Sequence, residues 1–308
     1  AIPLLNWDLI EYPKELGVKK VVSLSKDQEQ ALIQCIYMNL NRKTAGILIA
    51  LFTGVRIGEL CGLQMKDISL TDVVGSSIAR TAGDCVMYTY AGPEIAVAST
   101  KAYITQVEMM VLLAIDLGVK RGHLTESVAS ELLRQMADIP ALAEQVMALE
   151  PAVQRFSSLY HDRQHVFYIG RGLDNALAME ASLKLKEVSY IMSEAYAAGE
   201  LKHGTIALIE QGTLVCALLT QEHLADKTLS NVREVKSRGA KVLIVCPEAL
   251  RDRAAKDADE LWVIPDTASD LLPLLAIIPV QLFAYYMAVS RGCDVDKPRN
   301  LAKSVTVE

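Results

Sequence analysis

The sequence predicts an α/β fold built on a parallel sheet, and three observations support this prediction. From about residue 69, short β-branched runs alternate with long segments of helical periodicity, as in strands joined by crossover helices. Hydrophobic types make up 51% of the residues and charged types 22%, so the chain can bury a sizeable core. Its 308 residues exceed one ordinary core, so two domains or subdomains are expected.

The clearest unit is a complete doubly wound α/β unit over residues 164–292. Four strands are expected, at residues 165–169, 214–219, 241–246 and 261–264. Three helices are expected, at residues 175–195, 226–238 and 268–291. The last helix contains the apolar run from Leu271 to Val289, which we interpret as a buried core helix because Pro273, Pro279 and Gln281 interrupt it.

The upstream residues resemble only the back half of such a unit. A strand is expected at residues 85–90, a helix at 94–117 and a helical pair at 125–149. Before them, residues 1–71 are expected to form a short helical segment, with a capping box at residues 25–28. We therefore expect three parts, residues 1–71, 72–150 and 151–308, the last ending in a polar loop from residue 294.

Composition limits the partners and the compartment. The net charge of −6 argues against nucleic acid as a partner, because no basic excess neutralises phosphates. The six cysteines are scattered without metal-ligand spacing, so we expect no metal or other cofactor, and reduced thiols in the cytoplasm. Residues 1–20 carry charges throughout, so no signal peptide and no membrane association are expected.

Charged residues in the region of the first long helix are candidates for acid–base chemistry. Lys184, Glu187 and Glu194 would share one face of a helix over residues 175–195. A carboxylate beside a lysine on a buried face could abstract a proton next to a carbonyl, although a solvated, salt-bridged face has the same spacing. His203 follows in a glycine-bracketed loop, either as an acid–base partner or as an ordinary exposed histidine.

Three further motifs have both a functional and a structural interpretation. The Gly170-Arg171-Gly172 turn after a strand could cradle a phosphate or be only a tight turn. The small residues and hydroxyls of residues 74–77, including Val74 and Ser76, suit sugar oxygens or a plain turn. Lys303 in the tail could contact phosphate or form a Schiff base, or it could be a solvated lysine.

Residues 72–308 resemble the C-terminal part of the glutamine–fructose-6-phosphate aminotransferase family. The resemblance lies in five runs, residues 73–77, 91–102, 183–187, 194–204 and 296–308, of which the last two are highly specific. The resemblance implies a sugar isomerase (SIS) domain with two doubly wound subdomains, the first of them truncated here. In the family this domain converts fructose-6-phosphate and ammonia to glucosamine-6-phosphate, without a cofactor.

The same resemblance implies roles for individual residues. Glu187 is the base that moves a proton between C1 and C2, and Lys184 supports it. His203 assists ring opening and reaches the site from the neighbouring subunit of a homodimer, while Lys303 forms an imine with the open-chain ketose. Val74, Ser76 and Ala302 touch the sugar.

Two family features have no match in the sequence. The glutaminase half with its catalytic cysteine is absent, so no glutamine hydrolysis is expected. The Ser/Thr-rich loop that holds the sugar phosphate is also absent, which leaves catalysis by this chain open, because that anchor positions the reacting carbons. The alternative is a non-catalytic SIS-type module that binds a phosphosugar or only dimerises.

Residues 48–68 resemble the start of a tyrosine recombinase (phage integrase) catalytic domain, with Arg56 at the position of its first catalytic arginine. The later lysine, the His-x-x-Arg box and the tyrosine nucleophile have no counterpart, so no strand cleavage is predicted. The whole is interpreted as two gene fragments joined near residues 69–72. A DNA-binding remnant with a passenger domain is a third hypothesis, which the acidic balance disfavours.

Overall fold

The computed structural model describes residues 68–71, 85–92 and 94–302, all of which belong to one compact unit, residues 40–308. The helices predicted within residues 1–67 lie outside the described residues, as do Arg56, Val74, Ser76 and Lys303.

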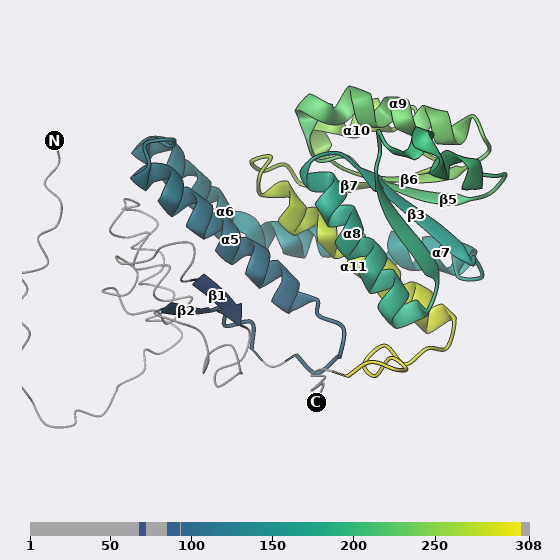
Figure 1. The fold of residues 1–308 in the computed structure, drawn as a ribbon, viewed down its shortest axis with the longest axis horizontal. Coiled ribbons are helices and arrows are strands. Elements are labelled where there is room, and N and C mark those ends of the chain that lie inside the picture. The colour runs from purple at the N-terminus through teal and green to yellow at the C-terminus, as the bar shows by residue number, and fades with distance from the viewer. Residues whose placement is uncertain (1–67, 72–84, 93, 303–308) are drawn as a thin grey trace, which may run out of the picture. The chain divides into compact units, whose positions relative to one another are not determined.

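A five-stranded parallel sheet forms the centre of the described residues (Figure 1). Its strands are β3 (His165–Gly170), β4 (Met192–Ala197), β5 (Leu214–Leu218), β6 (Lys241–Pro247) and β7 (Glu260–Ile264). They stand in the order β4-β3-β5-β6-β7, and all neighbours are parallel. The order reverses between β3 and β5, as in doubly wound folds, so the predicted fold class is confirmed.

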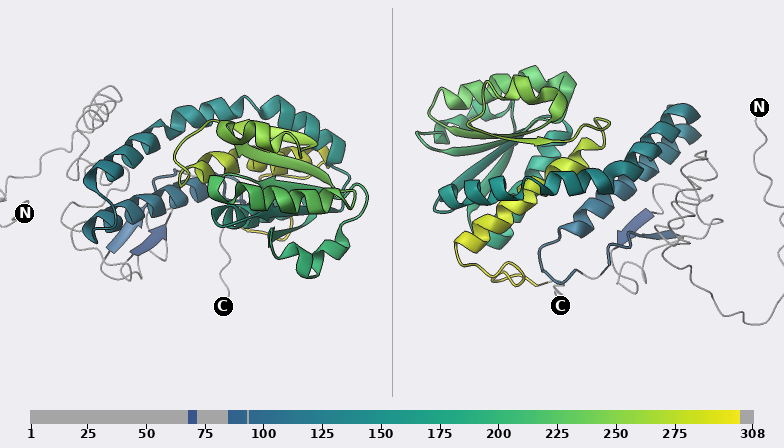
Figure 2. Two further views of the ribbon diagram at one scale, coloured as in Figure 1. Left: turned by 90° about the horizontal axis from the view of Figure 1, so that it is seen from above. Right: turned by 180° about the vertical axis from the view of Figure 1, so that it is seen from behind.

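Helices cover both faces of this sheet, because alternate side chains of each strand enter two separate cores. The helices are α7 (Glu150–Tyr160), α8 (Leu173–Ser189), α9 (Ala225–Lys236), α10 (Arg251–Ala254) and α11 (Leu272–Ser290). Val166 and Tyr168 of β3 face the core formed with α7, α8 and α11. Phe167 and Ile169 face the core formed with α9 and α10 on the opposite side (Figures 1 and 2).

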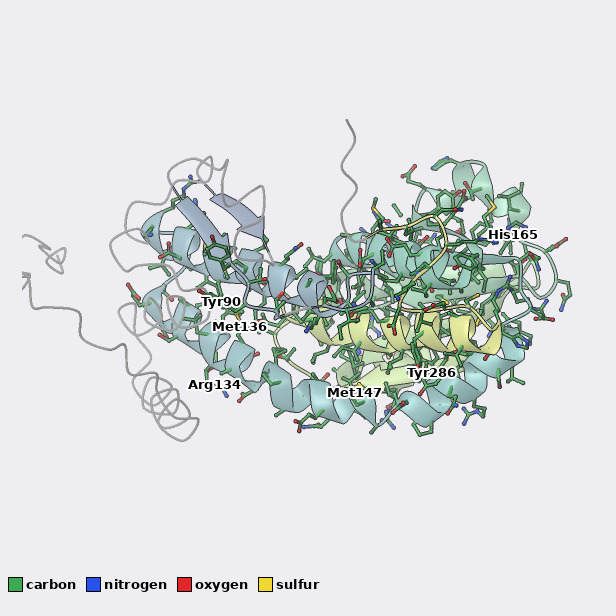
Figure 3. All side chains as sticks on the ribbon, turned by 90° about the horizontal axis from the view of Figure 1, so that it is seen from below. Tyr90, Arg134, Met136, Met147, His165 and Tyr286 are labelled. Carbon is green, nitrogen blue, oxygen red and sulfur yellow. The ribbon has the colours of Figure 1, made fainter. Side chains whose placement is uncertain are left out.

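Helix α11 is the buried core helix that the sequence predicts. Phe283, fully buried, lies at ring-centroid distances of 5.9 Å from Phe156 of α7 and 5.8 Å from Trp262 of β7. Tyr286, labelled in Figure 3, donates a hydrogen bond to the carboxylate of Glu150 at the start of α7. These contacts fix α7 and α11 against the same face of the sheet.

Two of the described helices, α5 (Lys101–Lys120) and α11, are long and apolar enough to cross a membrane by length and composition alone. In α11, 61% of the tested window is buried inside the protein, which is typical of a core helix. In α5 the buried share is 22%, and its buried residues pack in the same core as α11.

Helix α5 begins seven residues later than the predicted start at Glu94. The Glu94 carboxylate accepts hydrogen bonds from the backbone N–H of Thr100 at 2.6 Å and of Lys101 at 3.1 Å. Glu94 is therefore a capping group in the preceding loop, satisfying N–H groups that have no partner within the helix. Its negative charge also complements the positive end of the helix dipole.

The helical pair predicted at residues 125–149 is instead one helix, α6 (Glu126–Met147), with Pro140 in its interior. Proline removes one helical hydrogen bond and costs about 3 kcal/mol in a helix interior. Burial of Met136, Ile139 and Val146 in the core offsets this penalty. Figure 3 shows α6 with Arg134, Met136 and Met147 labelled along it.

The helix predicted over residues 175–195 is wrong at its C-terminal end. Helix α8 stops at Ser189, Tyr190 adopts a left-handed conformation, and residues 192–197 form strand β4 at the edge of the sheet. The sheet therefore has five strands rather than the predicted four. Glu194 lies on β4, opposite Phe167 of β3, so it does not share a helix face with Lys184 and Glu187.

The remaining described elements are short. Strands β1 (Ile68–Thr71) and β2 (Cys85–Tyr88) form a separate parallel pair. Four short 3-10 helices lie in the loops that follow strands of the main sheet: η3 (Leu201–His203), η4 (Thr205–Leu208), η5 (Glu222–Leu224) and η6 (Glu248–Leu250). Residues 294–302 contain no helix or strand, as predicted.

Candidate functional site

Lys184 stands between two carboxylates on the surface of α8. Its ammonium lies 2.6 Å from the Glu187 carboxylate and 3.5 Å from that of Glu180, at i+3 and i−4 on the helix. The Lys184 side chain is only 6% exposed, against 14% for Glu180 and 22% for Glu187. The sequence prediction that Lys184 and Glu187 form a pair is therefore consistent with a sheltered cluster rather than a solvated face.

Burial governs the electrostatics of this cluster. It raises the pKa of Glu180, although the charge and hydrogen bond of Lys184 oppose this effect. Burial also raises the pKa of Tyr103 on α5 to about 12, and the negative charge of Glu180 adds to that rise. Glu187 is the most exposed of the three charged groups, so its carboxylate is the one open to a small molecule.

The start of α8 is fixed by close packing at the end of β3. A Cβ on Gly170 would lie 2.4 Å from the backbone of Asp174, and Gly172 has a φ of +57°. The buried Asp174 carboxylate accepts hydrogen bonds from the backbone N–H of Thr220, at 2.9 Å, and of Gln221, at 3.3 Å. These contacts tie the start of α8 to the residues just after β5 and favour the tight-turn interpretation of the Gly170-Arg171-Gly172 motif.

Replacing Gly170 with alanine is expected to destabilise the fold by about 2 kcal/mol or more, because the new methyl group overlaps the backbone of α8. Urea unfolding measures this loss. The control is Gly122→Ala, where φ is +73° but no heavy atom lies within 4 Å of the added Cβ, so only backbone strain of about 1 kcal/mol is expected. Equal losses in the two variants would contradict the packing argument.

The C-terminal segment is fastened to the other end of α8. The backbone N–H of Arg299 donates to the Tyr190 hydroxyl at 2.8 Å, and the Arg299 guanidinium carbon lies 4.2 Å from the centre of the Tyr190 ring. Further back, the carbonyl of Asp296 accepts from the N–H of Val97 at 3.0 Å. In Figure 1 the yellow segment after α11 accordingly runs toward the loop that precedes α5.

The C-terminal segment contacts the end of α8 close to the lysine–carboxylate cluster. Tyr190 follows Glu187 by three residues, which is less than one helical turn. Ala302, predicted to touch the sugar, is exposed three residues beyond Arg299. Lys303 follows Arg299 by four residues in the sequence and lies outside the described residues.

His203 lies far from Glu187 within one chain. It belongs to η3, which follows the carboxyl end of β4, and the adjacent Leu201 packs in the core on the α9 side of the sheet. Glu187 lies fourteen residues along α8 from Leu173, about 21 Å toward the amino ends of the strands, on the opposite face. The exposed imidazole of His203 therefore cannot meet Glu187 of the same chain.

Two functional candidates were missed by sequence reasoning. Glu180 was detectable, because its i−4 spacing from Lys184 places both groups on one helix face. Tyr190 was not, because neither its left-handed conformation nor its contact with Arg299 has a local sequence signal. The described chain is thus a doubly wound α/β domain with a sheltered lysine–carboxylate cluster on a helix that flanks the sheet.

The family of this domain is shown by comparison. The SIS domain family matches residues 59–116 and 158–291, more than half of the chain, and the chain belongs to this family. The match begins inside the segment predicted as a separate helical part, residues 1–71. The recombinase resemblance and the three-part division remain predictions.

Among solved structures, the chain is similar to the C-terminal domain of glucosamine–fructose-6-phosphate aminotransferase from Francisella tularensis. The TM-score is 0.72 at 34% identity, covering 75% of this chain and 64% of the other. A glucosamine-6-phosphate deaminase from Thermotoga maritima matches with a TM-score of 0.57 at 26% identity, covering 78% of this chain and 66% of the other.

Curated relatives carry the name glutamine–fructose-6-phosphate aminotransferase (isomerizing). The protein from Caldanaerobacter subterraneus is 49% identical over 276 residues, which is 90% of this chain and 44% of the relative. The protein from Symbiobacterium thermophilum is 54% identical over 241 residues, 78% of this chain and 39% of the relative. The chain spans less than half the length of these relatives.

Proposed function

We propose that this chain provides the sugar-phosphate isomerase site of a glutamine–fructose-6-phosphate aminotransferase, acting on fructose-6-phosphate or glucosamine-6-phosphate in the cytoplasm. The observation that supports it best is the cluster of Lys184, Glu187 and Glu180 beside a fastened C-terminal segment. The membership of the SIS family and the names of the relatives give the substrate class.

Each group has a role that its chemistry fits. The Lys303 amine adds to the C2 carbonyl of the open-chain ketose and loses water, which forms an imine. Ammonia adds to this imine and displaces the Lys303 amine, and Glu187 then removes a proton from C1 of the resulting ketimine and returns it to C2. The Lys184 ammonium, 2.6 Å from Glu187, holds that carboxylate in place and balances its charge. Val74, Ser76 and Ala302 are assigned to sugar contacts.

The position of His203 supports a homodimer. Because His203 and Glu187 lie at opposite ends and on opposite faces of one sheet, both can reach one hexose phosphate only if two chains contribute. In this arrangement the partner's imidazole passes the proton of the C2 hydroxyl to the ring oxygen O5, so that the C2–O5 bond breaks and the C2 carbonyl forms, while Glu187 acts at C1 and C2. Each dimer would then contain two composite sites.

A thermal shift with fructose-6-phosphate tests the proposal first, because ligand that binds only the folded state raises the melting temperature. Isomerisation of fructose-6-phosphate to glucose-6-phosphate tests turnover. Binding with no turnover would instead support the non-catalytic phosphosugar-binding module. The absence of both binding and turnover would refute the proposed site.

Mixing two inactive variants tests the shared site. Glu187→Gln and His203→Ala, each inactive alone, should together recover about a quarter of wild-type activity, because half of the dimers are mixed and each mixed dimer has one intact site. The matched control mixes Glu187→Gln with Lys184→Met, which lie in the same chain's cluster and should recover nothing. Recovery in the control, or none in the test, would contradict the composite site.

A further inference from the structure

Tyr190 holds a backbone conformation that tyrosine disfavours. It follows the last residue of α8 with φ 60° and ψ 17°, the left-handed conformation that usually belongs to glycine or asparagine at this position. Among the described residues other than glycine, only Tyr90, Tyr190 and Asn300 have positive φ. A strained residue of this kind persists where its side chain has a use that glycine could not supply.

The Tyr190 side chain has such a use in its contact with the C-terminal segment. Its hydroxyl accepts the backbone N–H of Arg299, and its ring lies against the Arg299 guanidinium. The first contact fixes the backbone and the second is a cation–π interaction. Arg299 itself is exposed, so no surrounding core holds this part of the segment in place.

The rest of the segment is arranged around this contact. Pro298, just before Arg299, is buried, and the carbonyl of Asp296 accepts from Val97 in the loop before α5. Asn300, just after it, is left-handed with φ 63°, which turns the chain. The described part of the C-terminal segment is therefore fixed at Arg299, four residues before Lys303 in the sequence.

We propose that Tyr190 is a positioning residue that fastens the C-terminal segment to the end of α8 and so supports the imine chemistry assigned to Lys303, four residues beyond Arg299 in the sequence. The inference rests on the proposed function for the role of Lys303. The structural part of the inference, the fastening of the segment by Tyr190, is independent of the proposed function. The contact with Arg299 thus explains why a tyrosine occupies this left-handed position.

Hydrogen exchange tests the fastening independently of any activity. In Tyr190→Gly the backbone strain is relieved, so the melting temperature should stay the same or rise, while the Arg299 amide should exchange at least tenfold faster. Tyr190→Phe removes only the hydroxyl acceptor and should also speed exchange at this amide. The control, Tyr285→Phe, changes an exposed tyrosine on α11 and should leave it unchanged.

Unchanged exchange at Arg299 in Tyr190→Gly would overturn the inference. So would a large fall in its melting temperature, because Tyr190 would then be a structural residue of the helix end. These readings need no substrate, so they remain decisive even if the proposed function fails.

Trapping of the imine tests the positioning of Lys303. Fructose-6-phosphate and sodium borohydride should convert the lysine imine to a stable secondary amine, since hydride adds to the C=N carbon and a proton to nitrogen. Mass spectrometry should locate the adduct on Lys303 in the wild type and find at least tenfold less in Tyr190→Gly. An equal yield in both would overturn the positioning, whereas no adduct in the wild type would count against the proposed function alone.

Discussion

Replacing Glu187 with glutamine is expected to lower the rate of fructose-6-phosphate isomerisation by about 10²- to 10⁴-fold, the usual contribution of a positioned general base. The amide cannot accept the C1 proton, yet it has the same size and can still accept a hydrogen bond from Lys184, now 2.6 Å from the carboxylate. Lys184 also keeps Glu180 as a partner at 3.5 Å, so the fold should tolerate the change.

The measurement is the initial rate of glucose-6-phosphate formation, with the melting temperature recorded for each variant. The matched control is Glu131→Gln on α6, which removes an exposed carboxylate that also pairs with a basic side chain, Arg134. Its rate should be unchanged. An equal rate in wild type and Glu187→Gln would contradict the assignment of Glu187 as the general base.

Replacing Phe283 with alanine is expected to cost about 3–5 kcal/mol of unfolding free energy, the range for large buried aromatic residues. The ring is fully buried and contacts Phe156 and Trp262, so its loss leaves a cavity between α11, α7 and β7. The neighbouring helices cannot close this cavity without disturbing the sheet that supports α8.

Urea unfolding measures this effect against Tyr285→Ala on the same helix. The Tyr285 side chain is 44% exposed, so its truncation should cost no more than about 1 kcal/mol. Similar losses for the two variants would show that α11 is not a core helix on its Phe283 side.

The parallel sheet was predictable because its central strands are continuous apolar runs. Residues 214–218 and 241–247 are almost wholly buried on both faces, and such runs between amphipathic helices have few alternatives. Strand β4 was missed for the opposite reason. Its sequence, Met-Ser-Glu-Ala-Tyr-Ala, is rich in helix formers, and Tyr190 gives no glycine or proline signal that α8 has ended.

The candidate site was predictable only where its residues are local. Lys184 and Glu187 are three residues apart on a helix, so spacing alone indicated the pair. The prediction that Glu194 shares this helix face was wrong, because the helix ends earlier and Glu194 lies on strand β4. The contact of Tyr190 with Arg299 joins residues 109 positions apart, which no local pattern reveals.

The amino-acid sequence by itself determined the α/β class, most helices and strands, and the lysine–carboxylate pair, because these follow from periodicity and short spacings. Only the tertiary structure decided where α8 ends, which edge of the sheet His203 occupies, and what fastens the C-terminal segment. These features depend on burial and on contacts between distant segments, and such contacts override local propensity when the whole domain packs.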